Sequence, residues 1–122
     1  MLSDIIPEGF KDDVHHTLTE HNFKNTIINY FQSNGFFLVK TPLLEYSNKD
    51  TGTNTFKIVS KKSEKKLNIR DDITMQVARL SQTRLSKKTM PFKLCYYGEV
   101  VRKTGTMLRP ERQFLQIGAE CI

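Results

Sequence analysis

A helical repeat of apolar residues marks the first third of the chain. The repeat follows the spacing i, i+4, i+7 and i+8, and it comprises Phe23, Ile27, Tyr30 and Phe31, with Val14 and Leu18 extending it toward the N-terminus. Such a repeat predicts a helix from about residue 12 whose apolar face packs on the core. Asn34-Gly35 is expected to end this helix, because both residues tolerate the left-handed backbone of a C-cap.

Shorter apolar runs after this helix predict strands. Residues 36–41 form a short aromatic and β-branched run that is typical of a buried strand. Pro42 places this strand at an edge or an interface, since proline lacks the N–H that a central strand must donate. Residues 56–59 and 67–70 predict a hairpin, and the highly charged connection between them is expected to face solvent.

A second helix is predicted from Ile73, Val77 and Leu80, which stand at i, i+4 and i+7. Asp71 or Asp72 is suited to cap its N-terminus, because a carboxylate accepts hydrogen bonds from the first amides of a helix.

Three further strands are expected after the second helix: one over residues 92–97, one beginning at Val100-Val101, and one over residues 114–122. The last alternates, and its apolar set is expected to face the core: Leu115, Ile117, Ala119 and Cys121. The order of elements predicts an α+β domain, an antiparallel sheet flanked by helices, rather than a fold of βαβ units.

Length and composition limit the class of protein. The 122 residues suffice for one domain, and 38% hydrophobic with 26% charged residues is typical of a globular protein. No apolar run approaches the roughly 20 residues of a membrane helix, and the N-terminus lacks a secretory pattern. Cys95 and Cys121 lie in strand-like segments, which favours two free thiols and a cytoplasmic location.

The formal net charge of +6 is compatible with nucleic acid, nucleotide phosphates or an acidic partner protein. Four lysines lie in the charged connection of the predicted hairpin, which leaves a basic RNA-binding module as one alternative: Lys61, Lys62, Lys65 and Lys66. A solvated turn accounts for the same lysines, so this alternative ranks last.

Two segments carry groups that accept hydrogen bonds from an amine. Gln116 and Glu120 share one face of the last predicted strand, and Gly118 between them is expected to leave room for a ligand against the backbone. Asp72 and Thr74 follow a predicted strand end and open the second helix, where they either bind an amine or cap the helix. A solvated sheet face with a bulge at Gly118 remains an alternative for the strand.

A third segment is basic. Arg102 follows two valines, and Arg112 lies at the far end of the loop that begins there. Guanidinium groups bind carboxylate and phosphate oxygens, so both arginines are candidate anion-binding residues; a solvated basic loop is equally compatible. The three histidines lack metal-ligand spacing, and no phosphate-binding loop or nucleophile motif is present, so no catalytic residue and no metal site are predicted.

These segments, taken in order, resemble the class II aminoacyl-tRNA synthetases. Residues of about 23–45, which include the run Gly35–Glu45, resemble motif 1, and residues 92–122 resemble motif 2. The nearest likeness is to the histidyl branch, which holds histidyl-tRNA synthetase and the regulatory subunit of ATP phosphoribosyltransferase. The resemblance implies a class II synthetase-like core, truncated after motif 2 with motif 3 absent, and a homodimer through motif 1.

The resemblance also implies roles for single residues. Asp72, Thr74 and Gln116 correspond to residues that hold the amino group of bound histidine, and Glu120 to a glutamate that lines the histidine pocket. Arg102 corresponds to the motif 2 arginine that contacts the ATP α-phosphate and the substrate carboxylate.

Two departures favour the regulatory subunit. Thr104 stands where the synthetases have a glutamate, and the run Arg70–Thr74 reads Arg-Asp-Asp-Ile-Thr rather than Arg-Pro-Glu-Gly-Thr. The implied protein is non-catalytic, needs no cofactor, senses histidine and works with the catalytic subunit in the first step of histidine biosynthesis. The alternative is the N-terminal catalytic-core fragment of a histidyl-tRNA synthetase, which uses ATP, Mg²⁺ and tRNA.

Overall fold

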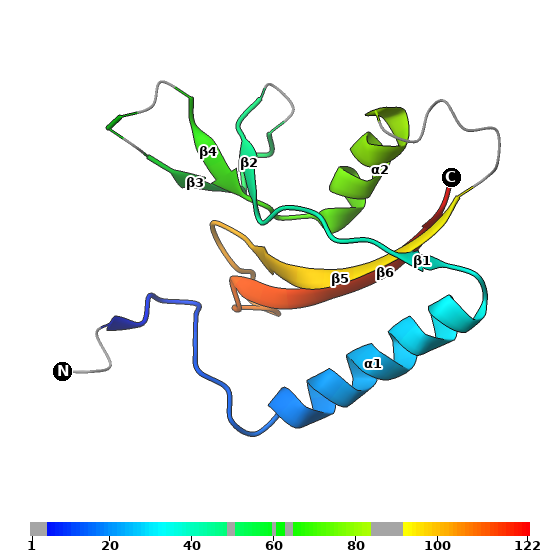
Figure 1. Ribbon diagram of the computed structural model, residues 1–122. Helices are drawn as coiled ribbons and strands as arrows, with labels where there is room; N and C mark the ends of the chain where they lie inside the picture. Colours follow the sequence, from blue (N-terminus) through cyan, green and yellow to red (C-terminus); the bar gives the residue numbers. More distant parts are fainter. Residues whose placement is uncertain (1–4, 49–50, 60, 63–64, 84–91) are drawn as a thin grey trace. The chain divides into compact units, whose positions relative to one another are not determined.

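The computed structural model describes residues 5–48, 51–59, 61–62, 65–83 and 92–122. Two helices and six strands follow one another along the chain (Figure 1): α1 (Thr17–Ser33), β1 (Phe37–Leu38), β2 (Leu44–Tyr46), β3 (Phe56–Ile58), β4 (Leu67–Ile69), α2 (Ile73–Thr83), β5 (Lys93–Val101) and β6 (Gln113–Cys121). They form two compact units. The first lies within residues 1–13, 42–71 and 99–114, and the second within 14–41, 72–98 and 115–122.

The first unit contains an antiparallel sheet with the strand order β2-β4-β3. This arrangement confirms the predicted hairpin, here β3 and β4. Asn68 lies on the central strand and is only 2% exposed. Its Oδ1 accepts a hydrogen bond from the Ser47 hydroxyl at 2.6 Å, and its Nδ2 donates to Thr51 Oγ1 at 3.2 Å. The buried amide therefore joins the sheet to the segment that follows β2.

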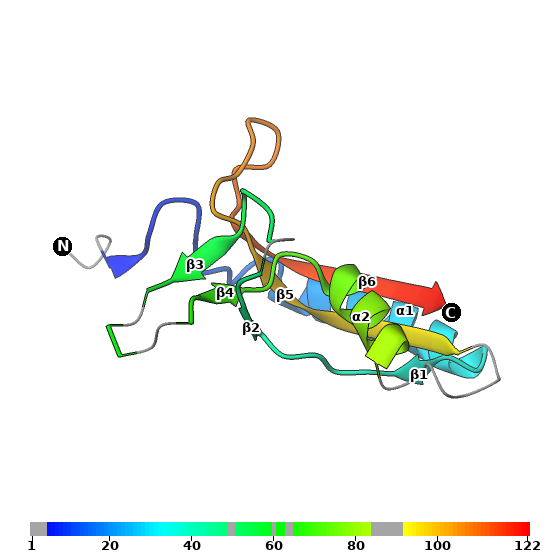
Figure 2. The ribbon, with the colours of Figure 1, turned by 90° about the horizontal axis from the view of Figure 1, so that it is seen from above.

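The second unit is built around part of a three-stranded sheet with the order β1-β5-β6. Helices α1 and α2 lie on opposite faces of the β5 and β6 strands of this unit (Figures 1 and 2). Adjacent residues of β5 contact the two helices, since neighbouring side chains of a strand point to opposite faces. The Tyr96 hydroxyl contacts Thr74 of α2, and the Lys24 ammonium of α1 lies 4.4 Å from the centre of the Tyr97 ring.

Helix α1 confirms the predicted end but not the predicted apolar face. The backbone N–H groups of Asn34 and Gly35 donate to the Phe31 and Gln32 carbonyls of its last turn, and Gly35 adopts a left-handed φ of +83°. Ile28 is the buried residue of the helix, whereas four members of the predicted face are exposed: Val14, Leu18, Phe23 and Tyr30. The predicted face was too wide: two of its members, Ile27 and Phe31, are half-buried, and together with the buried Ile28 they form a narrower stripe.

The predicted buried strand over residues 36–41 was also wrong. Strand β1 has two residues, Phe37 is 69% exposed, and the strand pairs in parallel with Leu94 and Cys95 of β5. The sheet is therefore mixed rather than purely antiparallel. β1 occupies the edge of this sheet, as Pro42 indicated, and an edge strand lacks a neighbour on its outer side.

Among residues 92–122, the described part of the chain after α2, there are two strands rather than three. Val100 and Val101 do not begin a new strand, because β5 runs unbroken from Lys93 to Val101. The expected core face of β6 is half-buried at Leu115, Ile117 and Ala119 and exposed at Cys121. Since both faces of the strands in the second unit are covered by a helix, burial does not alternate: Leu94, Cys95 and Tyr96 are all buried.

The buried Cys95 gives a testable difference in thiol chemistry. Burial raises the pKa of the Cys95 thiol, so the reactive thiolate is depleted and access is blocked. We expect Cys95 to resist a thiol reagent at about pH 8 in the native protein and to react once urea unfolds it. Mass spectrometry of the labelled peptides measures this, and rapid native labelling of Cys95 would contradict the packing of β5.

None of the described helices is long and apolar enough to cross a membrane.

Candidate functional site: a polar cluster at the start of helix α2

Five polar side chains meet in the second unit, where the N-terminus of α2 lies beside β5 and β6. We call them the polar cluster: Asp72, Thr74, Tyr96, Gln116 and Glu120. Four of them are half-buried, while Tyr96 is only 2% exposed. All four residues predicted to bind histidine thus lie together, although more than 40 positions separate Asp72 and Thr74 from Gln116 and Glu120 in the sequence.

One end of the cluster caps α2. The Asp72 carboxylate Oδ1 accepts hydrogen bonds from the Thr74 backbone N–H at 2.9 Å and from Gln116 Nε2 at 3.0 Å. Gln116 Oε1 in turn accepts from the Ile73 backbone N–H at 2.8 Å. Asp72 is therefore the helix cap, and Asp71 is not, since its carboxylate accepts from Thr55 in the first unit. The first amides of a helix need hydrogen-bond acceptors. The same hydrogen bonds that cap α2 therefore also hold the side chain of Gln116 in position.

The other end is organised by the Tyr96 hydroxyl. This oxygen lies 2.6 Å from Thr74 Oγ1 and donates to Glu120 Oε1 over 3.2 Å. Burial is the main cause that raises the pKa of the Tyr96 hydroxyl, and the Glu120 and Asp72 carboxylates raise it further. The phenol therefore stays protonated at neutral pH. Tyr96 is a site residue that was not predicted from the sequence; the only signal was a hydroxyl-bearing side chain within the strand expected over residues 92–97.

Gly118 serves this tyrosine rather than a ligand. A Cβ at position 118 would lie 2.4 Å from the Tyr96 hydroxyl oxygen and 2.6 Å from Cζ. The expectation that Gly118 leaves room for a ligand against the backbone was thus wrong, because the phenol of Tyr96 already fills that space. Gly118 therefore permits the close approach of the Tyr96 phenol of β5 to the backbone of β6.

The cluster is suited to a positively charged group. Its two carboxylates, Asp72 and Glu120, are hydrogen-bonded to neutral groups: a backbone amide, the Gln116 amide and the Tyr96 hydroxyl. Two half-buried carboxylates with neutral neighbours attract a cation, and an ammonium group can donate to both carboxylate and hydroxyl oxygens.

The predicted anion-binding arginines lie in the first unit. Arg112 donates from Nη1 to the Glu8 carbonyl at 2.9 Å, and its guanidinium lies 4.9 Å from the centre of the Phe10 ring and 5.5 Å from that of Phe56. The guanidinium of Arg102 lies 4.8 Å from the centre of the Phe114 ring. Both arginines therefore have internal partners, and their role in anion binding stays a prediction.

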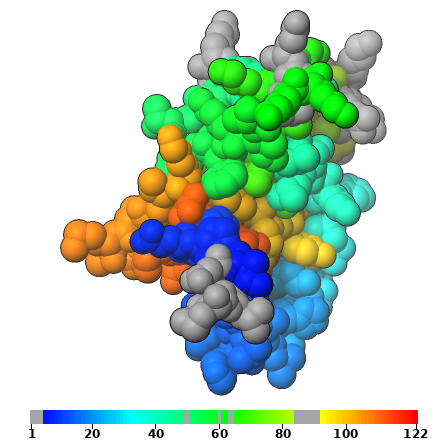
Figure 3. Space-filling model, turned by 90° about the vertical axis from the view of Figure 1, so that its left-hand side faces the viewer, coloured from blue at the N-terminus to red at the C-terminus, as the bar shows by residue number. Residues whose placement is uncertain are grey.

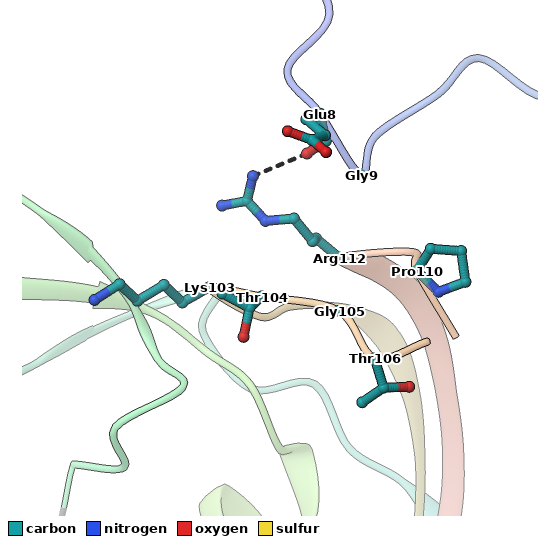
Figure 4. Close-up of a pocket in the computed structure, with 8 residues that line it drawn as sticks. All are labelled: Glu8, Gly9, Lys103, Thr104, Gly105, Thr106, Pro110 and Arg112. Carbon is teal, nitrogen blue, oxygen red and sulfur yellow. Dashed lines mark hydrogen bonds between the residues drawn. The ribbon is translucent and has the colours of Figure 1, made fainter. Parts of the chain in front are cut away.

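The N-terminal segment (blue) lies against the loop that joins β5 to β6 (orange) in Figure 3. A hollow of about 360 Å³ lies between them, beside Arg112 (Figure 4). Its lining residues are Glu8, Gly9, Lys103, Thr104, Gly105, Thr106, Pro110 and Arg112. The N-terminal segment is fixed there by a backbone hydrogen bond from Arg112 to the Gly9 carbonyl at 2.8 Å.

Thr104 is hydrogen-bonded to the side chain of Asn54, a contact that was not predicted from the sequence. The Thr104 backbone N–H and hydroxyl donate to Asn54 Oδ1 at 2.9 and 3.0 Å, and Asn54 Nδ2 donates to the Thr104 carbonyl at 3.2 Å. The start of the loop is thus held by one asparagine side chain.

Comparison with known proteins identifies the family of the chain. The sequence model of the family described as histidyl-tRNA synthetase matches residues 13–122. The chain is 42% identical over 103 residues to an ATP phosphoribosyltransferase regulatory subunit from Rhodospirillum rubrum, and 36% identical over 126 residues to that of Paramagnetospirillum magneticum. These alignments cover 79% and 97% of this chain but 27% and 33% of the relatives. The chain therefore spans about a third of the length of the curated relatives it matches.

A solved structure gives the same result for the fold. The protein from Bacillus halodurans described as an ATP phosphoribosyltransferase regulatory subunit/histidyl-tRNA synthetase superposes with a TM-score of 0.77 at 25% identity. The match covers 95% of this chain and 31% of the other. The α+β fold of a class II synthetase-like core is thereby confirmed. The profile match over nearly the whole chain, together with these relatives, establishes that the chain belongs to the histidyl-tRNA synthetase family.

Proposed function

We propose that this chain supplies a histidine-binding site to a non-catalytic regulatory subunit of ATP phosphoribosyltransferase. The observation that carries the proposal is the polar cluster, in which two half-buried carboxylates have neutral hydrogen-bond partners and so suit an ammonium group. The name shared by relatives that are 36–42% identical supports the regulatory role.

In this proposal, the α2 end of the cluster binds the amino group of histidine. Asp72 and Thr74 supply acceptor oxygens, and the hydrogen bonds of Gln116 to Ile73 and Asp72 hold them in place. Glu120 faces the same space through its contact with Tyr96 and is assigned to the remainder of the ligand. Arg102, and with it Arg112, is assigned to the ligand carboxylate or to phosphate.

The regulatory role requires that histidine bind one state of the assembly more tightly than another, because a ligand shifts an equilibrium only through differential affinity. The partner in that assembly is the catalytic subunit of ATP phosphoribosyltransferase. A homodimer through motif 1 belongs to the same proposal. It is supported by apolar side chains that this chain leaves exposed: Phe37, Leu38, Leu43 and Leu44.

Histidine binding to the intact protein tests the proposal. We expect titration calorimetry to detect binding, and Asp72→Ala or Gln116→Ala to weaken it at least about tenfold, because hydrogen bonds to charged groups contribute about 1.5–3 kcal/mol. Gln116→Ala removes both the acceptor for the Ile73 amide and the donor to Asp72 without adding a charge.

The matched control is Gln113→Ala, an exposed glutamine on the same strand, which should leave the affinity unchanged. Thermal unfolding of each variant separates loss of the site from loss of the fold. An intact protein that binds no histidine, or unaltered affinity in both cluster variants, would refute the proposal.

A histidyl-tRNA synthetase is the second candidate, since the family model that matches this chain is described by that activity. The residue at position 104 separates the two candidates. By the resemblance, the synthetases have a glutamate there, whereas this chain has Thr104, whose hydroxyl is hydrogen-bonded to Asn54. Histidine-dependent exchange of pyrophosphate into ATP distinguishes them. The regulatory subunit should show none, whereas robust exchange by the intact protein would favour the synthetase.

A further inference from the structure

We propose that Tyr96 is a specificity-determining residue of the polar cluster: its hydroxyl fixes the Thr74 hydroxyl as a hydrogen-bond acceptor, so that the site prefers a ligand with a protonated amine over the same ligand without it. The role of Tyr96 rests on the proposed function, the binding of histidine. It adds a residue that makes this binding selective for the amino group.

The direction of the hydrogen bonds follows from counting hydrogens. A tyrosine hydroxyl has one hydrogen, and Tyr96 donates it to the Glu120 carboxylate, which can only accept. The 2.6 Å contact between Thr74 Oγ1 and the Tyr96 oxygen must therefore be donated by Thr74. The hydrogens thus run in one direction, from Thr74 to Tyr96 to Glu120.

This direction determines what Thr74 offers to a ligand. With its hydrogen directed at Tyr96, the threonine oxygen presents only lone pairs, of which one faces Gln116 Nε2 at the long distance of 3.5 Å. Asp72 beside it also only accepts. Amine donors are therefore matched, whereas a ligand group that lacks hydrogens meets oxygens that cannot donate to it. Specificity of this kind arises because the wrong ligand leaves polar groups unpaired.

The packing around Tyr96 keeps this arrangement fixed. The ring is buried, and Gly118 provides the only spacing at which the hydroxyl fits over β6. Two titratable groups face the hydroxyl, Glu120 from β6 and Asp72 from the start of α2, and both raise its pKa. The phenol consequently remains a donor, and Thr74 remains an acceptor, across the neutral pH range. Without the hydroxyl, Thr74 is free to turn its hydrogen toward a ligand.

The test compares two ligands on the intact protein: L-histidine and imidazole propionate, which is histidine without its amino group. Calorimetry gives the ratio of their affinities. We expect Tyr96→Phe to reduce this ratio about tenfold by weakening histidine, because one charge-assisted hydrogen bond is of that order, while imidazole propionate changes less than about twofold. Thr74→Val should have the same effect, since it removes the same acceptor, and Thr74→Ser should keep the wild-type ratio.

The double variant Tyr96→Phe/Thr74→Val should lose no more than either single variant, because two residues that act through one hydrogen bond are not additive. Tyr97→Phe is the matched control, since Tyr97 is the next residue and contacts Lys24 instead. An unchanged ratio in Tyr96→Phe, or equal weakening of both ligands, would overturn the role of Tyr96. A wild-type protein that binds neither ligand would instead overturn the proposed function and this inference with it.

Discussion

Replacing Gly118 with alanine should destabilise the protein by about 2–4 kcal/mol, since overpacking costs about 1–3 kcal/mol and each lost hydrogen bond about 0.5–1.5 kcal/mol. The added methyl group would lie 2.4–2.8 Å from three atoms of the Tyr96 phenol. That ring is rigid and buried, so it cannot turn aside as a flexible side chain would. Its displacement would break the contacts to Thr74 and Glu120.

Urea unfolding monitored by circular dichroism measures this change in the free energy of unfolding. The matched control is Gly52→Ala, because a Cβ at position 52 meets only ordinary contacts at 3.6 Å from Thr55 and 3.8 Å from Asp71. We expect the control to change stability by less than about 0.5 kcal/mol. If Gly118→Ala and Gly52→Ala were equally stable, the Tyr96 phenol could move to accommodate the methyl group. Gly118 would then not determine the position of Tyr96.

Truncation of Asn68 to alanine should cost about 2–3 kcal/mol, because buried groups left without a partner cost about 1–3 kcal/mol. Asn68 lies on the central strand β4, and its side chain bonds both Ser47 and Thr51. Alanine would remove both bonds and leave the Ser47 hydroxyl without its acceptor. Asn68 belongs to the first unit, whereas Gly118 belongs to the second. Histidine binding is therefore a second measurement, and Asn68→Ala can destabilise the sheet of the first unit without weakening it.

Urea unfolding is again the measurement, with Lys57→Ala as the control. Lys57 pairs with Asn68 in the β3–β4 ladder but is exposed, so its truncation should have little effect. Asn68→Asp should not restore the wild-type stability, since it buries a carboxylate that accepts from Ser47 but cannot donate to Thr51 and has no charged partner. A loss in Asn68→Ala no greater than in the control would mean that the amide contacts contribute nothing to the sheet.

The loop after β5 differs from the polar cluster in the hydrogen-bond partners of its side chains. In the cluster, carboxylates face neutral groups, whereas Arg112 and Thr104 are occupied by contacts within the first unit. The synthetases that this chain resembles have a glutamate at the position of Thr104. In this chain the Thr104 hydroxyl donates a hydrogen bond to Asn54.

Local signals predicted the parts of the fold that depend on neighbouring residues. The end of α1 at Asn34-Gly35, the start of α2 at Asp72 and the β3–β4 hairpin follow from cap and turn chemistry, which acts within a few positions. Predictions about burial were weaker. The exposed Phe23 and Tyr30 carry the right periodicity for a core face, but which side of a helix is covered depends on the elements packed against it.

The site shows the same division. The amino-acid pattern was enough to predict the acceptor groups that an amine requires, which are carried by Asp72, Thr74, Gln116 and Glu120. That Tyr96 joins them, and that Gly118 makes room for a phenol rather than for a ligand, became evident from the packing of the strands and α2. The physical reason is that hydrogen bonds and close packing across 22 to 44 positions are set by the distance between α2, β5 and β6, which no local pattern encodes.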